Sequence, residues 1–178
     1  MNRLLKIIIG VWVFVLAGCS KEEDFLIDQR ESFESYLSRQ EGGYTVEGGV
    51  YRYVVNADRE GYANDPVIEY GDSVTFNFAA YTFGSPLGTL YYTNVQEWLS
   101  AGNTNLNTAY WDMTPRRVRL GYTPLLKGVE SGLVGNRMND SLLLFVTSDL
   151  AYGSVSVGAI GPDEPTVWSV KINNVVKQ

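Results

Sequence analysis

The distribution of hydrophobic and polar residues divides the chain into three parts. Residues 7–16 form a continuous uncharged run. Over residues 25–40, apolar side chains recur at helical spacing, with Leu26, Phe33 and Leu37 on one face and charged side chains mostly on the others. Several segments of the remaining chain have the alternation or the apolar runs that are typical of strands. The pattern therefore predicts an amphipathic helix followed by a largely β domain. The helix could pack on that domain or lie on a membrane, and its mixed acidic and basic polar face favours packing.

Strands are predicted wherever apolar and polar residues alternate between turn-forming residues. The clearest case is Ser73–Phe83, in which Val74, Phe76 and Phe78 alternate with polar residues after a Gly-Asp turn. The segment Leu87–Thr93 is expected to pair with it across the turn at residues 84–86. The other predicted strands are Val50–Val55, Arg116–Leu120, Thr166–Val176 and the strongly apolar Ser141–Thr147.

Two short helices are predicted between the strands. Asn94 and Glu97 have the spacing of a capping pair at the start of one. For the other, Thr123 is the expected N-cap, Pro124 the first helical residue and Gly135 the end. No alternation of strand and helix appears, so the predicted class is α+β, an antiparallel sheet wrapped around a short helix.

The N-terminus has the layout of a bacterial signal peptide. Arg3 and Lys6 precede the uncharged run, which at about ten residues is far shorter than the roughly 20 needed to span a membrane. The sequence Leu-Ala-Gly-Cys that follows, ending at Cys19, resembles a lipobox. We therefore expect residues 1–18 to be removed, Cys19 to be lipidated, and residues 19–24 to serve as a short tether.

Residues directly behind the cysteine suggest where the lipoprotein is sorted. Ser20 stands where an aspartate would indicate retention in the inner membrane, so the resemblance implies the outer membrane. Lys21 and the acidic run at residues 22–24 resemble a surface-export signal, although a solvated tether would have the same composition. The sequence leaves open whether the domain faces the periplasm or the cell surface.

Composition restricts the chemistry that the domain can perform. The chain has 14 basic and 20 acidic residues and a net charge of −6, and its one basic cluster is Arg116, Arg117 and Arg119. Nucleic acid is therefore not an expected partner. The chain has no histidine, and its single cysteine is assigned to the lipid. Zinc sites, catalytic triads and thiol chemistry are excluded, and we expect neither a metal nor a cofactor.

Residues 121–153 carry the most informative motif. They contain a glycine, two leucines and a glycine at the predicted helix, a turn with a methionine, a strand and then Ala-Tyr-Gly. This order resembles the FKBP-type peptidyl-prolyl cis-trans isomerases. Three other segments agree with the resemblance: residues 71–78, the Ile-Gly-Pro at 160–162 and the final strand from Val167. It covers residues 66–178, leaving residues 25–65 as an N-terminal extension and residues 94–115 as an insertion.

The resemblance also implies an apolar peptide-binding site. Tyr152 and Trp168 are the expected catalytic pair: the tyrosine hydroxyl meets the substrate carbonyl, and Trp168 forms an aromatic wall. The expected substrate-binding residues are Phe78, Tyr91, Leu125, Leu126, Val129 and Ile160.

Four positions differ from the family pattern. Val129 replaces the tryptophan that usually floors the pocket, and Tyr92 and Pro124 replace acidic residues. Arg116 lies near the position of a usual aromatic residue. The insertion adds Trp98, Tyr110 and Trp111, which either refill the cleft or cover the edge of the sheet; covering the edge is favoured.

The function implied is a membrane-anchored prolyl isomerase that assists the folding of exported proteins, with proline-containing segments as its partners. Prolyl isomerisation breaks no covalent bond, so it suits a site without histidine. The alternatives are an FKBP-like lipoprotein that binds peptides or proteins with little or no catalysis, and a purely structural surface protein.

Overall fold

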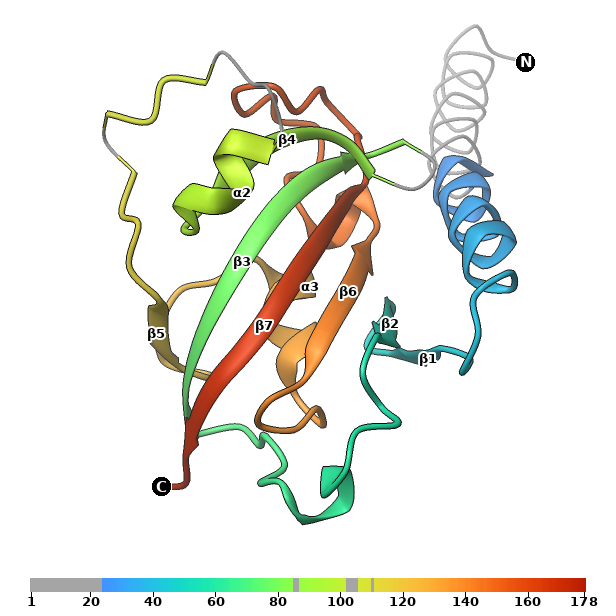
Figure 1. Cartoon of the computed structure of the whole chain (residues 1–178). Coiled ribbons are helices and arrows are strands. Elements are labelled where there is room, and N and C mark those ends of the chain that lie inside the picture. Colours follow the sequence, from blue (N-terminus) through green and yellow to red (C-terminus); the bar gives the residue numbers. More distant parts are fainter. Residues whose placement is uncertain (1–23, 85–86, 102–105, 110) are drawn as a thin grey trace, which may run out of the picture.

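The computed structural model describes residues 24–84, 87–101, 106–109 and 111–178. They form one antiparallel sheet with short helices, which confirms the predicted α+β class (Figure 1). The strands are β1 (Thr45–Glu47), β2 (Val50–Val54), β3 (Ser73–Phe83), β4 (Leu87–Thr93), β5 (Arg116–Arg119), β6 (Ser141–Val146) and β7 (Thr166–Val176). The helices that follow the N-terminal one are α2 (Gln96–Ala101) and α3 (Lys127–Leu133), with 3₁₀ turns η1 (Tyr62–Asn64) and η2 (Ser148–Leu150).

The strand order is β1-β2-β6-β7-β3-β4, and β5 also pairs with β3. The two eleven-residue strands β3 and β7 lie at the centre and have the limits predicted from their alternation. Along its free edge β3 has two successive partners: β5 pairs with residues 73–76 and β4 with residues 79–83. This change of partner falls beside the insertion, because β4 leads into it and β5 follows it.

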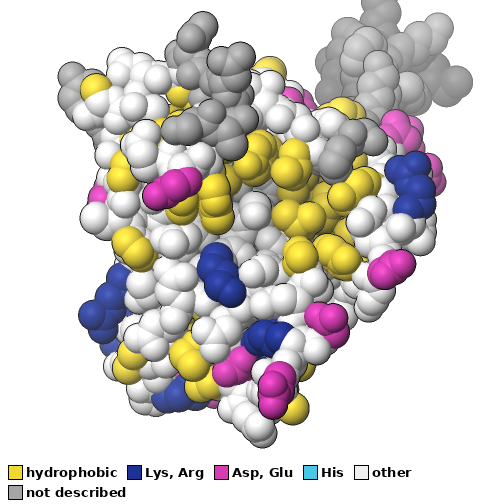
Figure 2. Space-filling view, viewed as in Figure 1, with side chains coloured by type: hydrophobic (Ala, Val, Ile, Leu, Met, Phe, Trp, Pro, Cys, Tyr) yellow, Lys and Arg dark blue, Asp and Glu magenta, His cyan; other side chains and the backbone are white. Residues whose placement is uncertain are grey.

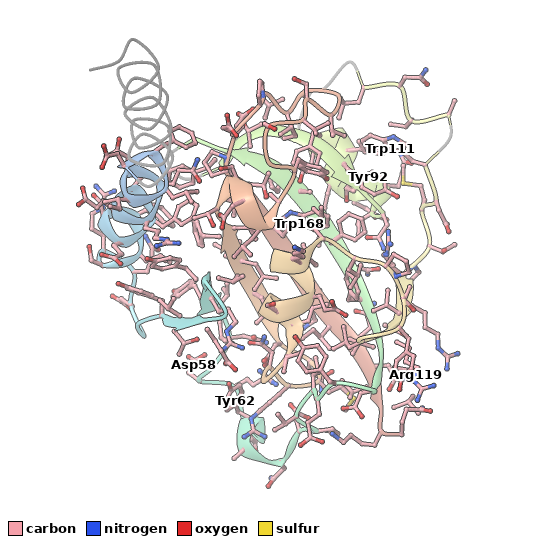
Figure 3. All side chains as sticks on the ribbon, turned by 180° about the vertical axis from the view of Figure 1, so that it is seen from behind. Asp58, Tyr62, Tyr92, Trp111, Arg119 and Trp168 are labelled. Carbon is pink, nitrogen blue, oxygen red and sulfur yellow. The ribbon has the colours of Figure 1, made fainter. Side chains whose placement is uncertain are left out.

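The inner face of the sheet packs on α3. Val74, Phe76, Phe78 and Ala80 of β3 are all buried in the main core, as alternation requires. From α3, the main core receives Val129 and Leu133. Figure 1 shows α3 behind the sheet, and the opposite view in Figure 3 shows it in front of the strands.

The N-terminal helix, described over residues 24–37, packs on the outer face. Phe33 and Leu37 are fully buried against Tyr51, Phe145 and Val167. Figure 2 shows apolar side chains gathered beside this helix on the face seen in Figure 1. Packing of the amphipathic helix on the domain is therefore confirmed. Among the described residues, no helix has the length and apolarity that a membrane crossing requires.

Two predicted helix starts are wrong. Helix α3 begins at Lys127 rather than Pro124, because residues 124–126 are not helical and Leu126, with φ −61° and ψ 136°, is the N-cap. The Thr123 hydroxyl accepts a hydrogen bond from the Arg119 backbone N–H and does not cap the helix. Helix α2 exists, but the Asn94 side chain binds β3 instead of capping it.

The predicted signal peptide, Cys19 and tether residues 20–23 lie outside the described residues. Tyr110 of the insertion lies outside them as well.

Candidate active site

An apolar cavity opens where the extended segment before α3 faces the centre of the sheet. Its volume is about 260 Å³. The lining side chains come from β3, β4, β5, β7, α3 and the loops before α3 and after η2: Phe76, Tyr92, Arg116, Pro124, Leu125, Leu126, Val129, Tyr152 and Trp168. All of these except Arg116 are apolar or aromatic, so the cavity suits a hydrophobic group such as a proline ring.

The extended segment before α3 accounts for one wall. Pro124 fixes its own φ and disfavours a helical conformation in the residue before it. Residues 124–126 lie outside the helix, Leu126 is extended with ψ 136°, and the chain becomes helical only at Lys127. As a result both leucines line the cavity, half-buried, instead of forming the first turn of α3.

Trp168 joins the cavity to an aromatic cluster beneath it. Its ring stacks on Phe78 with 5.1 Å between centroids, and Tyr91 meets it edge-on at 6.4 Å. Only 7% of Trp168 is exposed, and Phe78 is fully buried. Contacts with the buried Phe78 ring and the half-buried Tyr91 ring hold the indole at the cavity wall.

A β-bulge in β4 directs two consecutive tyrosines to the same side of the sheet. Ala80 pairs with Tyr92 and Tyr81 pairs with Leu90, so Tyr91 is the extra residue. Tyr91 contacts Trp168, while Tyr92 contacts Phe78 with centroids 5.1 Å apart. Figure 3 shows Tyr92 between Trp168 and Trp111.

Tyr152 lies on the opposite wall, in the loop that follows η2. That loop is closed by a hydrogen bond from Gly153 N–H to the Ser148 carbonyl, 2.7 Å long. The Tyr152 ring meets Tyr91 edge-on at 6.1 Å, and burial raises the pKa of its phenol. The hydroxyl therefore stays protonated at neutral pH and can donate a hydrogen bond.

The sequence of the region that builds this cavity matches a known family. Residues 67–173 correspond to the FKBP-type peptidyl-prolyl cis-trans isomerases. The chain belongs to this family. Membership confirms the predicted FKBP resemblance and, at the level of the family, the predicted enzyme class of prolyl isomerase.

Solved structures give the same fold at low sequence identity. A peptidyl-prolyl cis-trans isomerase from Pseudomonas syringae pv. tomato is 17% identical with a TM-score of 0.60, over 87% of this chain and 96% of that one. FkpA from Escherichia coli is 16% identical with a TM-score of 0.56, over 98% of this chain and 73% of that one. A structure of the three FKBP domains of wheat FKBP73 is 16% identical with a TM-score of 0.57, over 76% of this chain and 49% of that one. A search of curated proteins finds no significant match.

The residues assigned to the FKBP site from the sequence fall into two groups. Five of them line the cavity: Leu125, Leu126, Val129, Tyr152 and Trp168. Phe78 and Tyr91 lie beneath it and support Trp168. Ile160 is buried and pairs with Val157 in the loop before β7, outside the cavity lining.

Three further lining residues are positions that depart from the FKBP pattern and were not expected in the site. Tyr92, Arg116 and Pro124 all border the cavity. Phe76 also lines it, although the alternation of β3 had suggested only a core residue. No sequence signal announces the bulge that turns Tyr92 inward, because it arises from the pairing of β4 with β3.

Trp111 of the insertion does not fill the FKBP cavity. It is absent from the lining and contacts the outer side of Tyr92, with centroids 5.0 Å apart and planes at 86°. For Trp111, this agrees with the favoured expectation that the insertion covers the edge of the sheet and does not refill the cleft. Within the described ranges, no group of three or more acidic or cysteine side chains is placed to hold a metal ion.

Proposed function

We propose that the protein is a membrane-anchored prolyl isomerase that assists the folding of exported proteins. The observation that carries the proposal is the apolar cavity between Tyr152 and Trp168 in a chain of the FKBP family. A prolyl peptide bond rotates over a barrier of about 18–20 kcal/mol and isomerises slowly enough to limit folding. Catalysis of that rotation would therefore serve newly exported chains.

The cavity supplies what this rotation requires. The proline ring enters between Trp168, Leu125 and Val129, and displaces water from these apolar walls. Water hydrogen-bonded to the planar amide favours its resonance, so its removal lowers the cost of twisting. Tyr152 is the residue that donates a hydrogen bond to the substrate carbonyl as the amide twists. No proton is transferred, which fits the absence of histidine.

The proposal that the protein is anchored to a membrane rests on Cys19 and on the uncharged segment of residues 7–16 that precedes it. A cysteine carrying several acyl chains holds a protein stably on a membrane, whereas one chain does not. The tether of residues 19–24 would span at most about 20 Å even when fully extended. The site would therefore work on chains near the outer membrane, on its periplasmic or its external side.

The isomerase proposal is tested with the full chain and a proline tetrapeptide, measuring cis-to-trans conversion. We expect clear acceleration over buffer, and a loss of at least about ten-fold in kcat/KM for Trp168→Ala, because the aromatic wall is removed. Trp168→Phe is the matched control: it keeps a ring on Phe78 and should retain most of the activity. Tyr152→Phe should lower kcat more than it raises KM, since its hydrogen bond strengthens as the amide twists.

A rate equal to that of buffer, together with saturable peptide binding, would reject catalysis and favour the peptide-binding alternative. Anchoring is tested separately by labelling cells with palmitate. Label should appear in the wild-type chain and be lost in Cys19→Ser, and a labelled Cys19→Ser chain would reject the lipidation site.

A further inference from the structure

A second cavity adjoins the apolar one at the base of the insertion. Its volume is about 400 Å³, and Tyr92 and Arg116 line both cavities. The side chains special to the second cavity are mostly polar, including Asn94, Asp112 and Arg117. A peptide whose proline occupies the apolar cavity would therefore place a neighbouring side chain in a polar compartment, next to Arg116.

The Arg116 guanidinium is available to a ligand. A guanidinium has five N–H donors, and among the described residues this one makes a single long hydrogen bond, 3.5 Å to the Pro124 carbonyl. In the part of the chain that the structure describes, neither Arg116 nor Arg117 forms an ion pair with a carboxylate. Arg116 is half-buried, so water screens it less than it screens a fully exposed charge.

Among the described residues that line this second cavity, the one carboxylate is already engaged. Asp112 accepts hydrogen bonds from the backbone N–H and the hydroxyl of Thr114, at 2.9 and 2.7 Å. These bonds lower the pKa of Asp112, which stays ionised and is held in the turn before β5. The compartment thus has two cationic side chains and one anionic side chain, in a chain whose net charge is −6.

Resting on the proposed isomerase function, we propose that Arg116 selects proline segments with an acidic residue directly beside the proline. The planar guanidinium matches a carboxylate with two parallel hydrogen bonds, an arrangement that a lysine cannot reproduce. A basic flanking residue is correspondingly disfavoured by repulsion from Arg116 and Arg117. Arg116 is therefore a specificity-determining residue, separate from the aromatic side chains that hold the ring.

The test uses the full chain and terminally blocked peptides in which glutamate, glutamine or lysine stands before or after one proline. Isomerisation is followed by NMR exchange, and binding by titration of the same peptides. We expect kcat/KM to be about five-fold higher for glutamate than for glutamine in low salt, and the ratio to fall in high salt. Lysine should give the lowest value.

Arg116→Gln should bring the glutamate to glutamine ratio close to one. The matched control is Arg119→Gln, which removes the same charge from the far end of β5, outside both cavities; Arg119 lies well away from Trp168 and Tyr92 in Figure 3. This variant should keep the preference of the wild type. Arg116→Lys, which keeps the charge without the planar fork, should give an intermediate ratio.

The outcomes separate the two proposals. If the wild-type chain isomerises all peptides with a glutamate to glutamine ratio of one in kcat/KM, the acidic preference is overturned and the isomerase proposal stands. An unchanged preference in Arg116→Gln overturns the role of Arg116. Selective binding of glutamate peptides without acceleration supports the preference and rejects catalysis. Absence of both binding and acceleration overturns both proposals.

Discussion

Asn94 is the residue that closes a gap in the hydrogen bonding of β3. Between the segments paired with β5 and β4, the backbone of Phe78 has no strand on that edge. The Asn94 carboxamide accepts a hydrogen bond from Phe78 N–H at 2.8 Å and donates to the Phe76 and Thr114 carbonyls. One buried side chain thus replaces a short piece of strand and joins the two ends of the insertion.

We predict that Asn94→Ala lowers the free energy of unfolding by about 2–3 kcal/mol, because it leaves buried backbone groups without partners. Urea denaturation measures the change. Asn107→Ala is the control within the same insertion: Asn107 is exposed and accepts one hydrogen bond, from Ala109 N–H, so its loss should cost less than about 0.5 kcal/mol. Equal stability of the two variants would contradict this role of Asn94.

Site residues were predictable where the sequence carries a motif. The Leu-Leu pair and the Ala-Tyr-Gly motif led to Leu125, Leu126 and Tyr152, which do line the cavity. Tyr92 was not predictable as a lining residue, because regular alternation after Tyr91 would point it away from the cavity. Its orientation depends on one bulge in a pairing between strands, which no local pattern records.

At the scale of elements, α3 packs unusually close to β6. A Cβ built on Gly128 would lie 2.1 Å from Val146 Cγ1 and 3.2 Å from the Leu150 carbonyl oxygen. One turn later, a Cβ on Gly132 would lie 2.9 Å from Leu144 Cδ1. The two glycines therefore give α3 a face without side chains, which lets the helix lie close against β6. This close packing helps to position residues 124–126, which form one wall of the cavity.

We predict that Gly128→Ala destabilises the fold by about 2 kcal/mol, even though alanine is the better helix former by about 1 kcal/mol, because the methyl group overpacks the α3–β6 contact. Thermal unfolding of Gly128→Ala and the wild type measures this loss of stability. Ser131→Ala, a half-buried site on the same helix, should change stability by less than about 0.5 kcal/mol. Adding Val146→Ala should restore part of the loss, and Gly128→Ala as stable as the wild type would refute the close contact.

Elements were predicted best where a long pattern fixes them. Alternation along β3, and the spacing of Val167 or Trp168, Val170 and Ile172 in β7, predicted the correct limits of both strands, because a shift by one residue would reverse every side chain. For α3 the sequence predicts a start three residues too early, because Thr123 and Pro124 are residues typical of a helix start. In the structure the Thr123 hydroxyl accepts a hydrogen bond from the Arg119 backbone N–H instead of capping a helix, and Leu126 is the extended N-cap residue of α3.

Across the whole molecule, the N-terminal helix is linked to the loops on both sides of Tyr152. The buried Gln29 amide accepts a hydrogen bond from Ser148 N–H at 2.9 Å and donates to the Asp163 carbonyl at 2.9 Å. Ser148 begins η2, and Asp163 lies just before β7, so the two contacts bracket the segment that carries the tyrosine. The helix on the outer face thereby supports the site on the inner face.

The same helix makes the stability of the whole fold sensitive to alkali. The Tyr51 hydroxyl of β2 donates a 2.9 Å hydrogen bond to Glu34 of the helix. Burial and this hydrogen bond raise the pKa of Tyr51 from 10.0 to about 12. Because the pKa is higher in the folded state, the contribution is complete below pH 10, where the phenol is neutral in both states. It is lost as the pH rises from 10 towards 12, since the unfolded chain releases its proton first.

We therefore predict that the free energy of unfolding falls between pH 8 and pH 11.5, and that Tyr51→Phe shows a smaller fall. At pH 8 this variant should be less stable than the wild type by about 1 kcal/mol, the value of one hydrogen bond. Urea denaturation at the two pH values measures both effects. Tyr122→Phe is the control, because this side chain is 70% exposed. Between pH 8 and pH 11.5 its free energy of unfolding should fall by as much as that of the wild type. An equal fall in the wild type and Tyr51→Phe would mean that docking of the helix does not depend on this phenol.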